Sequence, residues 1–212
     1  VEIAGQGEVL ACKTLVADGM HIVLEKKAKT RIAERGICHN HYQPDGKAAL
    51  CAACDIGTTT VVCHLIDAQN GELLATQSAP NAQKTYGADV VSRIERAGAG
   101  ELDALHKAIT GQIGRMLENL CAATQQKGEI ERLTVAGNTV MCHLFAGISP
   151  EAIGVAPFVP EELFGNAYRG SDIGIAGCRS VEILPCVAGY VGSDITADVL
   201  AAVPEESDGQ WL

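Results

Sequence analysis

The sequence predicts an α/β protein in which helices pack against a mixed β-sheet. Three observations favour this class. Strand-like runs alternate with helical periodicity, aromatic residues make up only 4% while Leu, Ile, Val and Ala dominate, and 212 residues suffice to bury a sizeable core. From residue 48 onward, the expected order of elements is β-β-β-α-β-α-β-α.

Three strands open this order. We expect them at residues 50–56, 59–66 and 73–78, with a turn at residues 67–71 before the third strand. Consecutive strands joined by tight turns pair antiparallel. The sheet should therefore begin as a three-stranded meander.

A long connection, part of it helical, is expected at residues 80–100. Apolar residues then recur at spacings of three and four from Leu102 to Leu120, which predicts an amphipathic helix that ends before Gly128. The remaining expected elements are a strand at 133–136, a helix at 139–146, a short helix starting at Pro150, an ordered loop at 154–180, a strand at 181–184 and a helix from 194 to about 203.

The first part of the chain has a different character. Residues 1–24 are short and strand-rich, and residues 25–47 carry many charges with Gly, Pro and Asn, which is typical of a linker. We therefore expect three regions, at 1–24, 25–47 and 48–212. The first residue is not Met and an apolar run is only beginning at Leu212, so we expect the chain to be a fragment of a longer protein.

Charge and composition exclude several functions. A net charge of -10 disfavours binding to nucleic acid or to an anionic membrane surface, because both need clustered Lys and Arg. No run approaches the roughly 20 apolar residues that span a bilayer. Nine scattered cysteines are expected to be mostly reduced and buried. These observations predict a cytoplasmic protein.

The most informative segment is residues 55–60, which read Asp-Ile-Gly-Thr-Thr-Thr between the first two expected strands. Gly57 lets the backbone approach an anion, and the N–H groups and hydroxyls of Thr58 and Thr59 can converge on phosphate oxygens. Asp55 is suited to the hydration shell of Mg²⁺, which usually keeps several waters and bridges to phosphates. A plain hairpin with threonines that favour strands is the alternative.

Two expected helix starts carry further candidates. Asn138 and Thr139 follow a strand and open a helix, where N–H groups attract anions, although Asn is also a common N-cap. Asp194 has a similar position and is either a cap or the residue that orients an attacking water. Asp89 and Arg93 lie four apart, the spacing of a helical ion pair, and we assign them no role.

A zinc site is a rival hypothesis. Cys38 and His41, together with Cys51 and Cys54, offer a Cys/His ligand set. However, Cys51 and Cys54 fall in the expected first strand, where pleating directs residues three apart to opposite faces. This hypothesis is therefore not favoured.

Five segments in the same order resemble the reductive activators of corrinoid-dependent enzymes, within the actin, hexokinase and heat-shock ATPase superfamily. They are Asp-Ile-Gly-Thr-Thr-Thr-Val-Val at 55–62, Tyr-Gly-Ala-Asp-Val-Val-Ser-Arg at 86–93, Ala-Gly-Asn-Thr at 136–139, Gly-Val-Ala-Pro-Phe at 154–158 and Gly-Tyr-Val-Gly-Ser-Asp at 189–194. The resemblance implies that residues 48–212 form the first lobe of an actin-like ATPase fold, of the ribonuclease H-like type. It also implies that residues 1–24 are the tail of a 2Fe-2S ferredoxin-like domain.

The same resemblance implies the activity and its cofactors. Such proteins use ATP and Mg²⁺ to drive electrons from a 2Fe-2S cluster to an inactive Co(II) corrinoid, which returns to Co(I). Asp55 would serve the metal, Gly57, Thr58 and Thr59 the phosphates, and Asp194 the water. Cys12 would be the last cluster ligand, left without its C-x₄-C-x₂-C loop here.

The expected partner is the corrinoid protein of a cobalamin-dependent methyltransferase system. The second phosphate-binding turn of such proteins would follow residue 212, so we expect weak or no ATP turnover from these residues alone. An exposed lobe face would favour a homodimer. Two other functions remain open, a small-molecule kinase of the same superfamily and a non-catalytic actin-like or zinc-stabilised interaction module.

Overall fold

The computed structural model describes residues 2–3, 7–8, 22–23 and 49–202. The chain divides into two units, at 1–33 and 34–212, and each is described by itself. The first unit holds three short antiparallel strands in the order β2-β1-β3, namely β1 (Glu2–Ile3), β2 (Gly7–Glu8) and β3 (Ile22–Val23). Cys12 and residues 25–47 lie outside the described residues, so the ferredoxin-like tail and the linker remain predictions.

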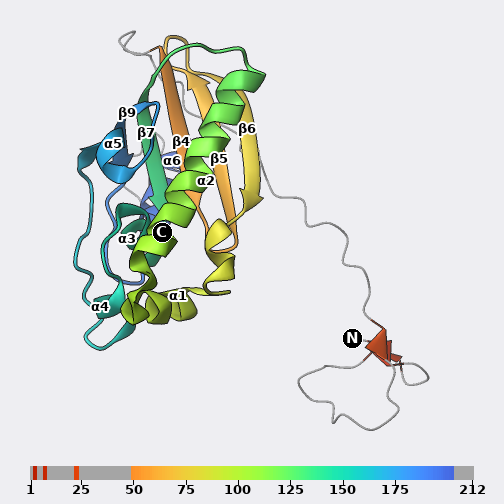
Figure 1. Cartoon of the computed structure of the whole chain (residues 1–212), viewed down its shortest axis with the longest axis vertical. Coiled ribbons are helices and arrows are strands. Elements are labelled where there is room, and N and C mark those ends of the chain that lie inside the picture. The colour runs from red at the N-terminus through yellow and green to blue at the C-terminus, as the bar shows by residue number, and fades with distance from the viewer. Residues whose placement is uncertain (1, 4–6, 9–21, 24–48, 203–212) are drawn as a thin grey trace. The chain divides into compact units, whose positions relative to one another are not determined.

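A six-stranded mixed sheet forms the second unit, in the order β6-β5-β4-β7-β9-β8 (Figure 1). Its strands are β4 (Leu50–Ile56), β5 (Thr60–Asp67), β6 (Glu72–Pro80), β7 (Ile130–Gly137), β8 (Ala167–Arg169) and β9 (Cys178–Ile183). The strands β4, β5 and β6 pair antiparallel as a meander, and β8 pairs antiparallel with β9. The strands β4, β7 and β9 run parallel to one another.

The described helices of this unit all follow the meander. They are η2 (Ala82–Thr85), α1 (Val90–Arg96), the π-helical η3 (Ala97–Glu101), α2 (Leu102–Ala123), α3 (Thr139–Ala146), α4 (Glu151–Gly154), α5 (Gly170–Ile173) and α6 (Ser193–Ala202). Set beside the strands, they confirm the predicted order β-β-β-α-β-α-β-α, with short elements added.

One face of the sheet is buried under α2 and α3. Along β4, Ala52, Cys54 and Ile56 are buried, while the residues between them are less so, as a strand covered mainly on one side requires. The helix α2 buries the predicted stripe, including Leu105, Ile109 and Ile113, and contacts β5 and β6, as Figure 1 shows. The helix α6 contacts β7.

The prediction of an ordered loop at residues 154–180 was wrong in part. Residues 167–169 form the edge strand β8, and α5 follows directly. Both elements are only three to four residues long and therefore carry no readable periodicity. The predicted amphipathic helix ends at Ala123, five residues before Gly128.

Among the helices of the described residues, none combines the length and the apolar character that a bilayer crossing requires.

Candidate functional site

The candidate site lies where β4, β7 and β9 end. Parallel strands share one direction, so their carboxyl ends meet at the same edge of the sheet, which is the usual place for ligands in α/β folds. Ile56 pairs with Gly137, and the chain turns directly after each of them. This register brings the Gly-Thr turn beside the start of α3.

The turn at residues 57–59 is tight. A Cβ on Gly57 would lie 2.7 Å from the carbonyl oxygen of Thr60, so no other residue fits this backbone without a shift. The Thr59 side chain is exposed and Thr58 is half-buried. The turn predicted from the sequence is therefore present, with a glycine that the geometry requires.

Asn138 joins this turn to α3. Its side-chain oxygen accepts a hydrogen bond from the N–H of Met141 at 3.0 Å, which confirms the predicted N-cap. Its Nδ2 donates to the Thr58 hydroxyl oxygen at 3.1 Å. The predicted cap is thus also a direct neighbour of the Gly-Thr turn.

Thr139 is buried, and its hydroxyl is engaged within the protein. The hydroxyl donates to the carbonyl oxygen of Ala188 at 2.6 Å, which ties α3 to the loop after β9. Thr139 therefore contributes to the site by placing this loop.

The loop after β9 packs against the start of α3 without room for a side chain. A Cβ on Gly192 would lie 2.4 Å from the Cα of Asn138. The Ser193 hydroxyl donates to the carbonyl oxygen of Gly137 and accepts from its N–H, both at 3.1 Å. One of the two expectations for Asp194 was that it caps α6, and Ser193 precedes it. Instead, both lie in its first turn and Ser193 connects the helix to β7.

Asp55 faces a concentration of negative charge. The pKa of its carboxyl is raised above the ordinary value, first by burial and then by the charges of Asp194 and Asp198. Because the residue as a whole is exposed, water screens part of this effect. Asp198 had no place in the sequence-based prediction, although it lies one helical turn after Asp194.

This environment fits a cation. Among the described residues, no group of three or more His, Cys, Asp or Glu side chains forms a complete protein cage for a metal. Mg²⁺ rarely needs one, because it is usually held by one or two carboxylates, several waters and the phosphates of a nucleotide. A carboxylate that already carries an unfavourable negative environment would gain from such an ion.

Arg93 and Asp89 serve different purposes, and neither was predicted. Asp89 is the N-cap of α1 and accepts the N–H of Ser92 at 2.8 Å in a capping box. Arg93 is fully buried, and its Nη2 donates to the carbonyl oxygen of Thr58 at 2.7 Å. A residue from α1 therefore contacts the Gly-Thr turn from the interior.

All five segments that carried the family resemblance are connected in space. Residues 86–93 reach 55–62 through Arg93, and residues 136–139 reach it through Asn138. Residues 189–194 contact 136–139 through Ser193. The rings of Phe158 and Tyr190 pack edge to face at 5.4 Å between centroids, which adds residues 154–158. One contiguous network thus contains every segment.

The zinc hypothesis gains no support from the cysteines that the structure describes. Cys54 is buried, and its sulfur lies 3.3 Å from that of Cys63 on β5. Cys51 lies three residues earlier on the same strand and is only half-buried. Cys38 and His41 lie outside the described residues.

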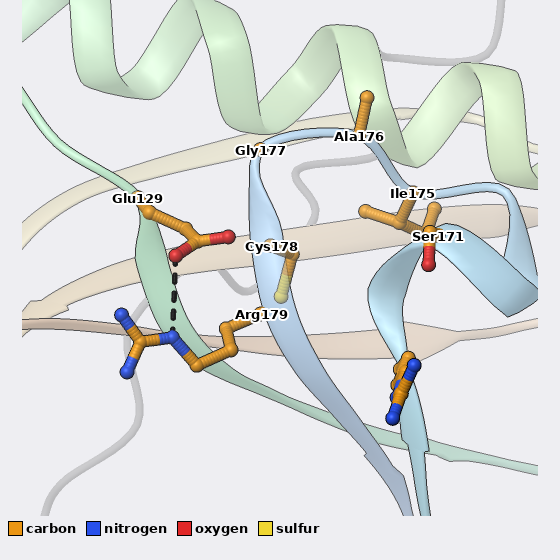
Figure 2. A pocket seen from close by; sticks show the side chains of 8 residues that line it. Glu129, Ser171, Ile175, Ala176, Gly177, Cys178 and Arg179 are labelled. Carbon is orange, nitrogen blue, oxygen red and sulfur yellow. Dashed lines mark hydrogen bonds and ion pairs between the residues drawn. The ribbon is translucent and has the colours of Figure 1, made fainter.

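A pocket of about 300 Å³ lies at the other edge of the sheet, where β7 and β9 begin (Figure 2). Arg179 points into this region and contacts Glu129 at 3.2 Å and Glu131 at 2.8 Å. Its charge is therefore balanced by two carboxylates.

The sheet order and the three converging turns are those of the first lobe of an actin-like ATPase fold of the ribonuclease H-like type. Comparison with known proteins agrees with this class. The family described as the RACo middle region matches residues 50–205, and the chain belongs to this family.

Two relatives illustrate the similarity. The chain is 35% identical over 159 residues to the corrinoid activation enzyme RamQ of Eubacterium limosum, a match that covers 73% of this chain and 27% of that protein. A solved structure of a reductive activator for a corrinoid, iron-sulfur protein is 37% identical, with a TM-score of 0.70. That match covers 73% of this chain and 26% of the activator.

The resemblance to reductive activators of corrinoid-dependent enzymes is therefore confirmed. The chain spans about a quarter of the length of the relatives it matches.

Proposed function

We propose that this chain is part of an ATP-dependent reductive activator that returns Co(II) corrinoid proteins to Co(I). The observation that carries the proposal is the 35% identity to an enzyme named for corrinoid activation. That match is about as long as the family segment at residues 50–205, which contains all three turns. A 2Fe-2S cluster would supply one electron per cobalt, and bound ATP would supply the driving force.

The site residues have distinct proposed roles. Asp55 holds the hydration shell of Mg²⁺, and the N–H groups and hydroxyls of Thr58 and Thr59, beside Gly57, bind phosphate oxygens. Asp194 orients the attacking water, since phosphoryl transfer depends mainly on positioning and on electrostatic stabilisation. The acidic side chains near Asp55, those of Asp194 and Asp198, support the metal role because their charges make a cation favourable there.

Asn138 and Thr139 support the site through α3. Asn138 holds the Thr58 hydroxyl and so orients a phosphate ligand. The N–H groups at the start of α3 add a favourable electrostatic potential for an anion. Cys12 is proposed as a ligand of the 2Fe-2S cluster, a role that requires further ligands from a longer protein.

The proposed partner is a corrinoid protein of a cobalamin-dependent methyltransferase system, in the cytoplasm, and the activator is proposed to act as a homodimer. The net charge of -10 supports a protein partner over nucleic acid. The names of the two relatives support the corrinoid partner.

Nucleotide binding is tested with the 212-residue chain. In a titration with Mg·ADP followed by amide spectra, we expect shifts at Thr58, Thr59 and Asn138, with weak affinity. Shifts confined to residues of the Figure 2 pocket, such as Ser171 or Gly177, would contradict the proposed site.

Reductive activation is tested in a chimera. Residues 50–203 of this chain replace the matching segment of a corrinoid reductive activator, and the Co(II) and Co(I) absorbance bands are followed after ATP is added. Conversion to Co(I) that needs both ATP and an intact Asp55 is expected. A folded, cluster-loaded chimera that phosphorylates a small molecule instead would favour the kinase hypothesis.

A further inference from the structure

The three carbonyl groups of the Gly-Thr turn are all bound from inside the protein. Asn81 Nδ2 donates to the Gly57 oxygen at 2.8 Å, and Arg93 Nη2 donates to the Thr58 oxygen at 2.7 Å. The backbone N–H of Asn81 donates to the Thr59 oxygen at 2.9 Å. Every peptide of the turn is thus oriented by residues 81 and 93.

Because the peptide bond is planar, these contacts with the carbonyl groups also determine where the N–H groups of the turn point. In a trans peptide, the C=O of one residue and the N–H of the next point in opposite directions. Asn81 is only 1% exposed and Arg93 is 0% exposed, so the Gly57 and Thr58 carbonyls point toward the interior. The N–H groups of Thr58 and Thr59 therefore point away from the interior, together, as an anion-binding nest requires.

Arg93 is held in place by neutral groups. Its Nε donates to the Gly87 carbonyl oxygen at 3.0 Å, and its Nη1 lies 3.3 Å from Gln83 Oε1 and 3.0 Å from Met141 Sδ. Gln83 is anchored in turn by donating to the Leu105 carbonyl oxygen at 3.0 Å. A guanidinium stays protonated in proteins, so its positive charge is buried directly behind the turn.

We propose that Arg93 and Asn81 are positioning residues that create the phosphate-binding face of the turn, and that the Arg93 charge strengthens its attraction for phosphate. This inference rests on the proposed role of the turn in binding nucleotide. Neither residue touches the ligand. Both act by orienting the peptides of residues 57–59.

The first measurement needs no ligand. In the free 212-residue chain, we expect the amide protons of Thr58 and Thr59 to exchange with water much faster than those of Val61 and Cys63, which lie within β5. In Arg93→Gln, the ¹⁵N shifts of Thr58 and Thr59 should move while those of Val61 stay unchanged. Protection of the Thr58 and Thr59 amides equal to that of β5 would overturn the inference.

The second measurement compares two phosphate probes. We expect Arg93→Gln and Asn81→Asp to weaken binding of Mg·ADP and of magnesium pyrophosphate by the same factor, about 10-fold or more, because the turn contacts only phosphate. Arg93→Lys keeps the charge and should recover part of the loss. Asn81→Asp has nearly the same shape as wild type, so it remains informative if Arg93→Gln fails to fold.

A matched core variant separates positioning from general stability. Leu120 is a buried residue near the end of α2, and Leu120→Ala creates a cavity in the core there. It should lower the unfolding midpoint and leave both affinities unchanged. If wild type binds both probes and the Arg93 and Asn81 variants bind them as tightly as wild type does, the inference that these residues position the turn is wrong. The proposed function then still stands. If wild type binds neither probe, the proposed function fails, while the exchange measurement still decides the positioning.

Discussion

Asp55, the proposed metal residue, has an unfavourable electrostatic environment. Its pKa is raised by burial and by Asp194 and Asp198, so the folded state holds a proton on Asp55 more tightly than the unfolded chain does. Its contribution to stability is complete below the ordinary value of 3.8 and is lost as pH rises through the folded pKa. At neutral pH, without a cation, ionised Asp55 therefore opposes folding.

For Asp55→Asn we expect two opposite effects. The free energy of unfolding at pH 7 should rise without metal, because a neutral amide is not repelled by Asp194 and Asp198. The stabilisation that Mg·ADP gives to wild type should disappear, because the amide no longer holds the ion's water shell. Urea unfolding with and without Mg·ADP measures both. A variant less stable than wild type without metal would contradict the electrostatic reasoning.

His143 makes the core sensitive to acid. It is fully buried, its Nδ1 lies 2.8 Å from the Thr139 carbonyl oxygen, and its Nε2 accepts the N–H of Glu162 at 3.3 Å. Its pKa is lowered from 6.5, mainly by burial. The folded state therefore favours neutral His143, and stability should be complete above pH 6.5 and decline as pH falls through the unfolded pKa toward the folded one.

His143→Gln tests this pH dependence. Wild type should lose more unfolding free energy between pH 7.5 and 5.5 than the variant, because only wild type must keep a buried imidazole unprotonated. Urea unfolding curves at both pH values give the comparison. Equal losses in the two proteins would show that other groups cause the acid sensitivity.

The helices of the second unit differ in how they are held. The helix α3 is buried on nearly all sides, from Val140 to Phe145, and Asn138 and Thr139 anchor its start. The helix α2 has one buried stripe and one solvent face. The stability of α2 should therefore respond to intrinsic helix propensity, while α3 depends on packing.

Gly114→Ala should stabilise the protein. Gly114 lies inside α2 with open space around its Cα, so alanine would reduce the entropy of the unfolded chain without a clash, worth about 0.5–1 kcal/mol. Thermal or urea unfolding measures the gain. Gly71→Ala is the matched control, because it also has open space but a φ of +76°, and it should destabilise. A gain from both substitutions would contradict this reasoning.

On the scale of the whole molecule, the second unit contains its own core. The described core residues run from Leu50 to Cys186, and the six-stranded sheet is complete within residues 50–183. Because this core and this sheet both lie within the second unit, the unit should fold without the first 33 residues. The apolar side chains that it leaves exposed include Ile195, Val199 and Leu200 on α6.

A polypeptide of residues 34–212 tests this independence. We expect one cooperative unfolding transition with the same midpoint as the corresponding transition of the 212-residue chain, since the hydrophobic core is retained. Circular dichroism in urea is sufficient. A clearly lower midpoint would show that residues 1–33 contribute to the stability of the second unit.

Much of the fold could be predicted because its signals are local. Alternation predicted β4 and β5 within one residue, the stripe from Leu102 to Leu120 predicted α2, and Asn138 was correctly expected as an N-cap. These features depend on periodicity and capping, which short stretches of sequence express. The contact between the Gly-Thr turn and the start of α3 was not predicted, although residues of both had been named as candidates.

Arg93 could not be predicted in the same way. Its spacing from Asp89 resembles that of an exposed helical pair, and nothing local indicates that its guanidinium is buried against Thr58. Asn81 likewise reads as an ordinary turn residue after β6. Their roles arise from contacts between residues 10, 24 and 35 positions apart, which only the assembled fold brings together.

The contact at Gly192 limits how this chain can vary. A methyl group there would overlap Asn138, Gly137 and Thr139 at once, so the loop after β9 and the start of α3 cannot change independently. In a fully randomised library at residue 192, selection for folded protein should return glycine alone. Insertions that lengthen the loop should be tolerated only upstream of this residue, which makes Gly192 a natural anchor for aligning distant members of its family.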